Sequence, residues 1–162
     1  MLYVRRWTSK PAGSTFRSPS PSEMQNKPLA ERSILLVEDD IILSTDVAFA
    51  LTEAGCRAVV PATANAAALS ALVHYVFDAA ILDVNVQDEW VFPVANALDT
   101  VGIPFLFLSA YSHDSIPAQH RGRPFIQKPH HREGLLVALV ELMDGEPQPT
   151  AANDELTGNR TG

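Results

Sequence analysis

Residues 79–83, Ala-Ala-Ile-Leu-Asp, decide the fold, because four apolar residues are followed at once by a carboxylate. A short, fully apolar run is typical of a buried strand in a parallel sheet. Three other short runs that are mostly apolar also precede polar groups: Ile34–Val37 before Glu38 and Asp39, Pro104–Leu108 before Ser109, and Phe125–Gln127 before Lys128. Because parallel strands end at one crevice where ligands bind, we expect these groups to lie together.

Helical patterns separate the strands. A stripe of Ile42, Val47, Ala50, Leu51 and Ala54 predicts a first helix that stops at Gly55. After a strand at residues 57–60, a second helix capped by Thr63 or Asn65 runs through Val76, with Ala68, Leu69, Leu72 and Val73 facing inward. The remaining helices are expected at residues 90–99 and 132–143, with a short or frayed helix within 115–120. This alternation predicts an α/β fold, a doubly wound five-stranded parallel sheet covered on both faces.

Composition divides the chain into a domain and two tails. We expect a disordered, basic, Pro- and Ser-rich arm over residues 1–31, one domain over 32–143 and a disordered tail over 144–162. The arm weakly resembles a transit peptide, but nothing in it is periodic, and a start at Met24 would also give a sensible protein. Whether residues 1–23 belong to the native protein is therefore open.

Charge and hydropathy exclude several classes of partner. Residues 32–143 carry 13 acidic and 6 basic residues, a net charge of −7, which is a poor match for nucleic acid. No apolar run approaches the roughly 18 residues that a membrane span needs. The one cysteine, Cys56, cannot form an internal disulfide and fits a reducing compartment, so we expect a cytoplasmic protein with an inert free thiol.

The three carboxylates at the strand ends predict a cation site. Glu38, Asp39 and Asp83 offer the oxygen ligands that Mg²⁺ prefers, without a closed protein cage. Their mutual repulsion predicts that at least one carboxyl has a raised pKa when no metal is bound. Asp40, by contrast, is interpreted as the N-cap of the following helix.

The strand-end motifs resemble those of the receiver domain of two-component response regulators. The resemblance covers roughly residues 33–143 and rests on four motifs in the family's order: ILLVEDD (34–40), AAILDVNV (79–86), FLFLSAY (105–111) and QKP (127–129). Each motif alone is weak, but the four together, each at a strand end, are specific. The resemblance implies the flavodoxin-like and CheY-like strand order 2-1-3-4-5.

The resemblance also implies a role for each site residue. Asp83 would be the phosphoacceptor, and Glu38 and Asp39 would hold Mg²⁺ together with Asp83 and the backbone carbonyl of Asn85. The residues expected to contact the phosphoryl group are Ser109, Ala110 and Lys128. Phe125 and Tyr111 are candidate switch aromatics, although Phe125 has no hydroxyl to bond.

Two departures from the usual pattern point to a subgroup. The segment after Asn85 is shortened to Gln87-Asp88-Glu89-Trp90, and the fourth helix is truncated. Both features resemble the single-domain receivers with a Phe-Ala-Thr-Gly-type fourth strand that accompany atypical bacterial histidine kinases, and residues 107–111 match that strand approximately.

Three functions are compatible with these residues. The first is a single-domain response regulator that accepts a phosphoryl group on Asp83 from a histidine kinase or phosphotransfer protein and signals through protein contacts. Such a protein would catalyse only its own phosphorylation and dephosphorylation. We expect no DNA-binding module after the domain, because too few residues follow Met143. The second is a Mg²⁺-dependent phosphohydrolase like the haloacid dehalogenases, which is disfavoured because Asn85 stands where a second acid would protonate the leaving group. The third is a pseudo-receiver that binds partners without being phosphorylated.

Overall fold

The computed structural model describes residues 27–145, and residues 1–26 and 146–162, which hold most of the predicted arm and tail, lie outside the described part. Its strands are β1 Ser33–Val37, β2 Ala58–Ala62, β3 Ala79–Leu82, β4 Asn85–Val86, β5 Glu89–Trp90, β6 Phe105–Ser109 and β7 Phe125–Gln127. Its helices are α2 Ile41–Glu53, α3 Asn65–His74, α4 Phe92–Val101 and α5 Arg132–Asp144, with the 3₁₀ turns η1 His113–Ser115 and η2 Ala118–His120. None of the helices between residues 27 and 145 is long and apolar enough to cross a membrane.

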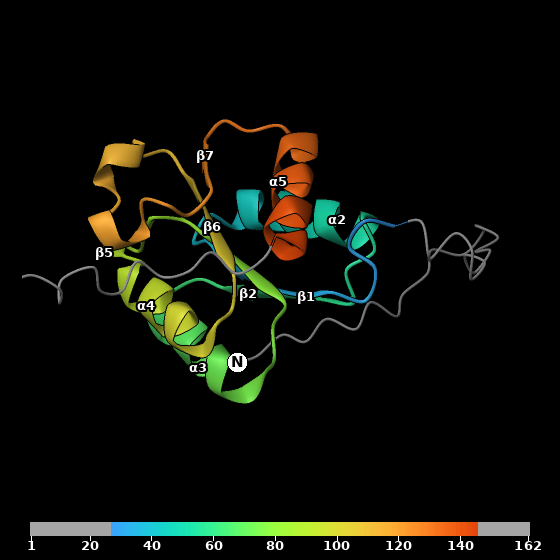
Figure 1. Cartoon of the computed structure of the whole chain (residues 1–162), viewed down its shortest axis with the longest axis horizontal. Coiled ribbons are helices and arrows are strands. Elements are labelled where there is room, and N and C mark those ends of the chain that lie inside the picture. The colour runs from blue at the N-terminus through green and yellow to red at the C-terminus, as the bar shows by residue number, and fades with distance from the viewer. Residues whose placement is uncertain (1–26, 146–162) are drawn as a thin grey trace, which may run out of the picture.

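Five of the strands form one parallel sheet in the order β2-β1-β3-β6-β7. Because β6 and β7 are the fourth and fifth parallel strands along the chain, this is the predicted order 2-1-3-4-5. The sheet is doubly wound: α2 and α5 cover one face, and α3 and α4 cover the other (Figure 1). The predicted fold class is confirmed.

The central strands are apolar throughout because both of their faces are covered. In β1, Leu35 and Val37 pack toward α3 and α4, whereas Ile34 and Leu36 pack toward α2 and α5. The same alternation holds in β3 and β6, and every residue of these three strands is buried. This rigid centre fixes the positions at which the strands end.

Some details of the predicted helices are wrong. Ile42 and Val73 are exposed, because the buried stripes consist of Ser44, Val47, Ala50 and Leu51 in α2 and of Asn65, Ala68 and Ala71 in α3. The N-cap of α3 is Ala64, without a side-chain cap, so neither Thr63 nor Asn65 caps it. The side-chain amide of Asn65 (Nδ2) instead donates to the backbone carbonyl oxygen of Trp90 at 3.0 Å.

The segment after β3 forms a hairpin that the sequence did not predict. β4 and β5 pair antiparallel across Gln87 and Asp88, whose φ angles are 52° and 62°. Two consecutive left-handed residues give the tight turn whose twist suits a two-residue hairpin. The helix predicted to begin at Trp90 therefore begins at Phe92, after the hairpin.

The short or frayed helix expected within residues 115–120 is replaced by the two 3₁₀ turns η1 and η2 between β6 and β7. His120 anchors this segment: its ring is 1% exposed and packs among the rings of Phe92, Phe105 and Phe107. Its Nε2 lies 2.9 Å from Oδ1 of Asn96 in α4. Burial lowers the pKa of His120, which favours the neutral ring in this aromatic setting.

Residues 27–32 belong to the folded domain, which corrects the predicted boundary at residue 31. Leu29 is 0% exposed and packs in the core on the α2 and α5 side, and its amide donates to the carbonyl oxygen of Ala54 at 3.1 Å. Gly55, with a φ of 101°, ends the first helix as predicted and lies against the Lys27 side chain. Residues 27–32 therefore cover the core next to the C-terminal end of α2.

Leu29→Ala should lower the free energy of unfolding by about 3 kcal/mol, because it leaves a cavity under α2. Urea denaturation measures this loss. Val76→Ala, at a side chain that is 87% exposed, is the control and should change stability by less than about 0.5 kcal/mol. A loss of the control's size for Leu29→Ala would mean that the turn is not part of the cooperative core.

Candidate functional site

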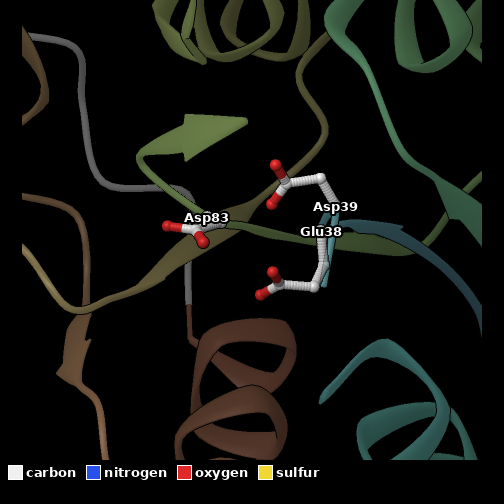
Figure 2. A group of neighbouring side chains, drawn as sticks. All are labelled: Glu38, Asp39 and Asp83. Atoms are coloured by element: carbon white, nitrogen blue, oxygen red, sulfur yellow. The ribbon is translucent and has the colours of Figure 1, made fainter. Parts of the chain in front are cut away.

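Three carboxylates gather where β1 and β3 end. Glu38 and Asp39 follow β1, Asp83 follows β3, and the two strands pair in parallel up to Val37 and Leu82. One carboxylate oxygen of each residue lies within 4.8 Å of the others. Figure 2 shows the three side chains at the adjacent ends of the two strands. The predicted convergence of these residues is observed.

Lys128 bridges two of these carboxylates. Its Nζ lies 2.7 Å from Oε2 of Glu38 and 2.8 Å from Oδ2 of Asp83. The lysine follows β7, and its backbone amide donates to the carbonyl oxygen of Ser109 at 2.9 Å. This bond fixes the position of the Lys128 backbone, from which the side chain extends to the two acids. The sequence predicted that Lys128 lies with the acids at the strand ends and contacts a phosphoryl group, but neither of its contacts with a carboxylate was predicted.

Ser109 holds the other oxygen of Asp83. Its buried Oγ donates to Oδ1 of Asp83 at 2.9 Å, and the amide of Tyr111 donates to the same Oγ at 3.3 Å. Both oxygens of Asp83 are therefore occupied, one by a hydroxyl and one by an ammonium. These two donors hold the carboxylate in one orientation, and the Asp83 residue is only 9% exposed.

Burial sets the protonation balance of the Glu38–Lys128 pair. Glu38 is 3% exposed, and burial raises the pKa of its carboxyl, although the bonds from Lys128 and from the Asp40 amide oppose the shift. Burial also acts to lower the pKa of Lys128, but hydrogen bonds to Asp83 and Glu38 outweigh it, so this pKa is raised. The predicted raised carboxyl pKa is thus found at Glu38, with desolvation rather than like-charge repulsion as its main cause.

Asp39 is the exposed member of the cluster, and the hairpin orients it. The amide of Gln87 donates to Oδ2 of Asp39 at 2.8 Å. Gln87 was not among the predicted site residues, since it acts through its backbone. The sequence gave little signal for it, because Gln87-Asp88 is not one of the residue pairs, such as Asn-Gly or Asp-Gly, that mark a two-residue hairpin.

The other predicted residues surround this centre. Asn85 begins β4, and its amide lies 3.4 Å from Oδ1 of Asp83. Ala110 follows Ser109 and is exposed, and Tyr111 comes next. Phe125 begins β7 and packs edge-on against His113, with ring centroids 5.5 Å apart. Asp40 lies outside the cluster and caps α2 by accepting from the amides of Ile42 and Leu43, as interpreted from the sequence.

The donor set fits a hard divalent cation. When ionised, three carboxylates share one ammonium, so two negative charges in the crevice lack a partner among the described side chains. Oxygen ligands of this kind suit Mg²⁺, which keeps several of its waters. Asp39 would hold such an ion most directly, because the Gln87 amide takes only one of its two oxygens. Both oxygens of Glu38 and both oxygens of Asp83 already accept hydrogen bonds.

Comparison with known proteins relates this arrangement to one family of folds. No family model and no curated protein matches the sequence, but many solved structures match the chain. The non-phosphorylated HemR receiver domain of Leptospira biflexa is 28% identical with a TM-score of 0.62, and the match covers 72% of this chain and 97% of that one. The chemotaxis protein CheY4 of Vibrio cholerae is 26% identical with a TM-score of 0.62, covering 70% and 99%. The chain has the fold of CheY-like receiver domains.

A third structure agrees with this placement in the receiver fold. SdrG of Sphingomonas melonis Fr1 is 34% identical with a TM-score of 0.59, and the match covers 72% of this chain and 98% of that one. All three matches span nearly the whole of the known structure, so the receiver fold accounts for the described domain as a unit. The acidic crevice of this chain therefore lies at the carboxyl edge of a receiver sheet.

Replacing Lys128 with Met should leave two buried carboxylates without a cation and lower the free energy of unfolding at pH 7 by about 3 kcal/mol. The raised pKa of Lys128 means that its stabilisation is present below the unfolded value near 10.5 and is lost only as pH rises through the folded value. The raised pKa of Glu38 means that its ionised form costs stability above the unfolded value near 4.5. Acidification through the pKa of Glu38 should therefore shrink the loss caused by Lys128→Met.

Urea denaturation in EDTA at pH 4, 7 and 9 measures this effect. Lys128→Arg, which keeps the positive charge, is the matched control and should lose less stability than Lys128→Met. If the loss in Lys128→Met were the same at all three values of pH, the lysine would act through packing rather than charge.

Proposed function

We propose that this chain is a response regulator receiver that accepts a phosphoryl group on Asp83 from a histidine kinase or a histidine phosphotransfer protein. One observation carries the proposal: the Asp83 carboxylate is held between the Ser109 hydroxyl and the Lys128 ammonium, beside two further acids. A nucleophilic carboxylate flanked by a hydroxyl donor and a fixed cation has the parts that an aspartyl phosphate requires.

The transfer itself is a displacement at phosphorus. An oxygen of Asp83 forms a bond to the phosphorus of a phosphohistidine, the phosphorus–nitrogen bond breaks, and the imidazole leaves with its electron pair and takes up a proton. The product is an acyl phosphate on Asp83. Such a transition state spreads charge over three equatorial oxygens, so catalysis consists mainly of positioning and electrostatic stabilisation.

The residues of this chain divide that task. Before transfer, Lys128 and Ser109 orient Asp83; during transfer, the ammonium and the hydroxyl can move to phosphoryl oxygens, since both donors lie within 3 Å of the carboxylate that is modified. Ala110 is an exposed residue next to Ser109 in the chain, and its backbone amide is a further candidate donor. Glu38 keeps Lys128 in place after Asp83 has been modified, because it is the second partner of the ammonium.

A divalent cation, Mg²⁺ by the chemistry of its ligands, would neutralise charge on a phosphoryl oxygen when bound. The proposed ligands are Asp39, Asp83 and the backbone carbonyl of Asn85. Glu38 is the fourth residue of the proposed site and also holds Lys128. Asp39 suits this role because the Gln87 amide takes only one of its two oxygens.

The outcome of phosphorylation is proposed to be a change in protein contacts. A phosphoryl group adds up to two negative charges next to Ser109 and Lys128, and drawing both inward shifts the segment after β6. That segment contains two 3₁₀ turns instead of an α-helix, so few backbone hydrogen bonds oppose its rearrangement. The chain would catalyse only its own phosphorylation and dephosphorylation, and its half-buried free thiol Cys56 suits the reducing cytoplasm.

We also propose that the chain belongs to the subgroup of receivers with a Phe-Ala-Thr-Gly-type fourth strand. This proposal is supported by the sequence Phe107-Leu108-Ser109-Ala110-Tyr111 and by the absence of an α-helix between β6 and β7. Phe125 lies against His113 rather than offering a hydroxyl to Ser109, so the switch would not use a bond between these two residues.

Incubation with Mg²⁺ and a small acyl-phosphate donor should add the mass of one phosphoryl group to the wild-type chain and none to Asp83→Asn. Intact mass spectrometry gives the result directly. Asp40→Asn is the matched control: it also exchanges an acid for its amide, but Asn still caps α2, so this variant should be phosphorylated like the wild type.

The proposal would be contradicted if the wild type gained no phosphoryl group either from the small donor or from a phosphorylated histidine phosphotransfer protein. A gain of equal size in Asp83→Asn would place the acceptor elsewhere. Continuous release of phosphate from small phosphomonoesters over many cycles would favour the phosphohydrolase instead.

A further inference from the structure

The hairpin β4–β5 touches both sides of the crevice. At its turn, the Gln87 amide donates to Asp39 on the acidic side. At its far end, the Trp90 ring meets Tyr111 on the side of Ser109, with ring centroids 5.4 Å apart and an interplanar angle of 63°. A single short element therefore lies between the acidic cluster and the segment after β6.

Several contacts hold the hairpin end that carries Trp90. The Asn65 amide on α3 donates to the carbonyl oxygen of Trp90 at 3.0 Å, and the amide of Val91 donates to Val84 at 3.0 Å. The indole ring also stacks on Phe92, with centroids 5.7 Å apart and planes 9° from parallel. These contacts hold Trp90 in place, although the residue is 47% exposed.

Tyr111 lies on the other side of this contact. It follows Ser109 by two residues, is 44% exposed, and precedes the segment that contains the two 3₁₀ turns. Its amide donates to Oγ of Ser109, and this Oγ donates to Asp83. A continuous path of contacts therefore runs from Trp90 through Tyr111 and Ser109 to the proposed phosphoacceptor.

We propose that the Trp90–Tyr111 contact, which we call the aromatic bridge, is a positioning device: Trp90 holds Tyr111, and through it the Ser109 hydroxyl, in the arrangement that prepares Asp83 for phosphoryl transfer. The part of this proposal that concerns transfer rests on the proposed function. The part that concerns the position of Tyr111 and Ser109 does not, because it describes the unphosphorylated chain. An edge-to-face aromatic pair is worth roughly a two- to tenfold change in an equilibrium.

The first arm of the test is amide hydrogen exchange, followed by NMR without any phosphoryl donor. Trp90→Ala should speed exchange of the Tyr111 amide roughly two- to tenfold and leave amides in β1 unchanged. Trp90→Phe, which keeps an aromatic ring, should restore most of the protection. Tyr75→Ala removes an aromatic pair with Phe77 away from the crevice and is the control that should leave the Tyr111 amide unaffected.

A double-mutant cycle separates positioning from general loosening. Tyr111→Ala breaks the aromatic bridge from its other side while keeping an amide at position 111. If the bridge is the cause, Trp90→Ala should add nothing to the exchange rate measured in Tyr111→Ala. Additive effects in the double variant, or faster exchange in Tyr75→Ala of the same size, would overturn the proposal.

The second arm measures the rate at which Asp83 gains phosphoryl from a small acyl-phosphate donor with Mg²⁺. Trp90→Ala should slow this rate two- to tenfold in the wild-type background and leave it unchanged in Ser109→Ala, since the effect passes through that hydroxyl. Equal slowing in both backgrounds would overturn the path through Ser109. If the wild type gained no phosphoryl at all, the proposed function would fail, while the exchange arm would still decide whether the aromatic bridge positions Tyr111.

Discussion

The crevice depends on one shared ammonium group. Lys128 makes two short contacts, to Glu38 and to Asp83, and so neutralises part of the charge that the ends of β1 and β3 bring together. Without it, two poorly exposed carboxylates would face each other with no cation between them, and a buried charge that lacks a compensating charge costs several kcal/mol. With it, the cluster is stable but still negative. Lys128 therefore allows the acids to converge but leaves a net negative charge on the cluster, which a bound cation can neutralise.

The sheet makes this arrangement possible. The centre of β1, β3 and β6 is buried on both faces, and the parallel register aligns their carboxyl ends within a few residues of one another. Lys128 comes from the edge strand β7, where the backbone bond to Ser109 ties it to β6. The apolar core thus sets distances between polar groups that are up to 90 residues apart in the chain. Its packing is a condition of the chemistry, although no core side chain takes part in it.

Much of this could be read from the sequence because the signals are local and repeated. Four apolar runs that end in Glu38, Asp83, Ser109 and Lys128 predict both the parallel sheet and the edge at which these groups meet. The Lys128–Glu38 contact was missed, because its two residues belong to different strands and no spacing rule relates them. The hairpin was missed because Gln87 is an uncommon residue at a left-handed position, which hides the turn. Leu29 was assigned to the arm since an isolated apolar residue among prolines and charges gives no periodic pattern.

When its three acids are ionised, the cluster keeps two negative charges that no described side chain neutralises, and a divalent cation can compensate for them. Isothermal titration of the wild-type chain with Mg²⁺ tests it most directly, with Asp39→Asn and the helix-capping control Asp40→Asn measured beside it. We expect one Mg²⁺ per chain in the wild type and in Asp40→Asn, and much weaker binding in Asp39→Asn. Mg²⁺ binding that was absent from the wild type, or that was unchanged by Asp39→Asn, would contradict it.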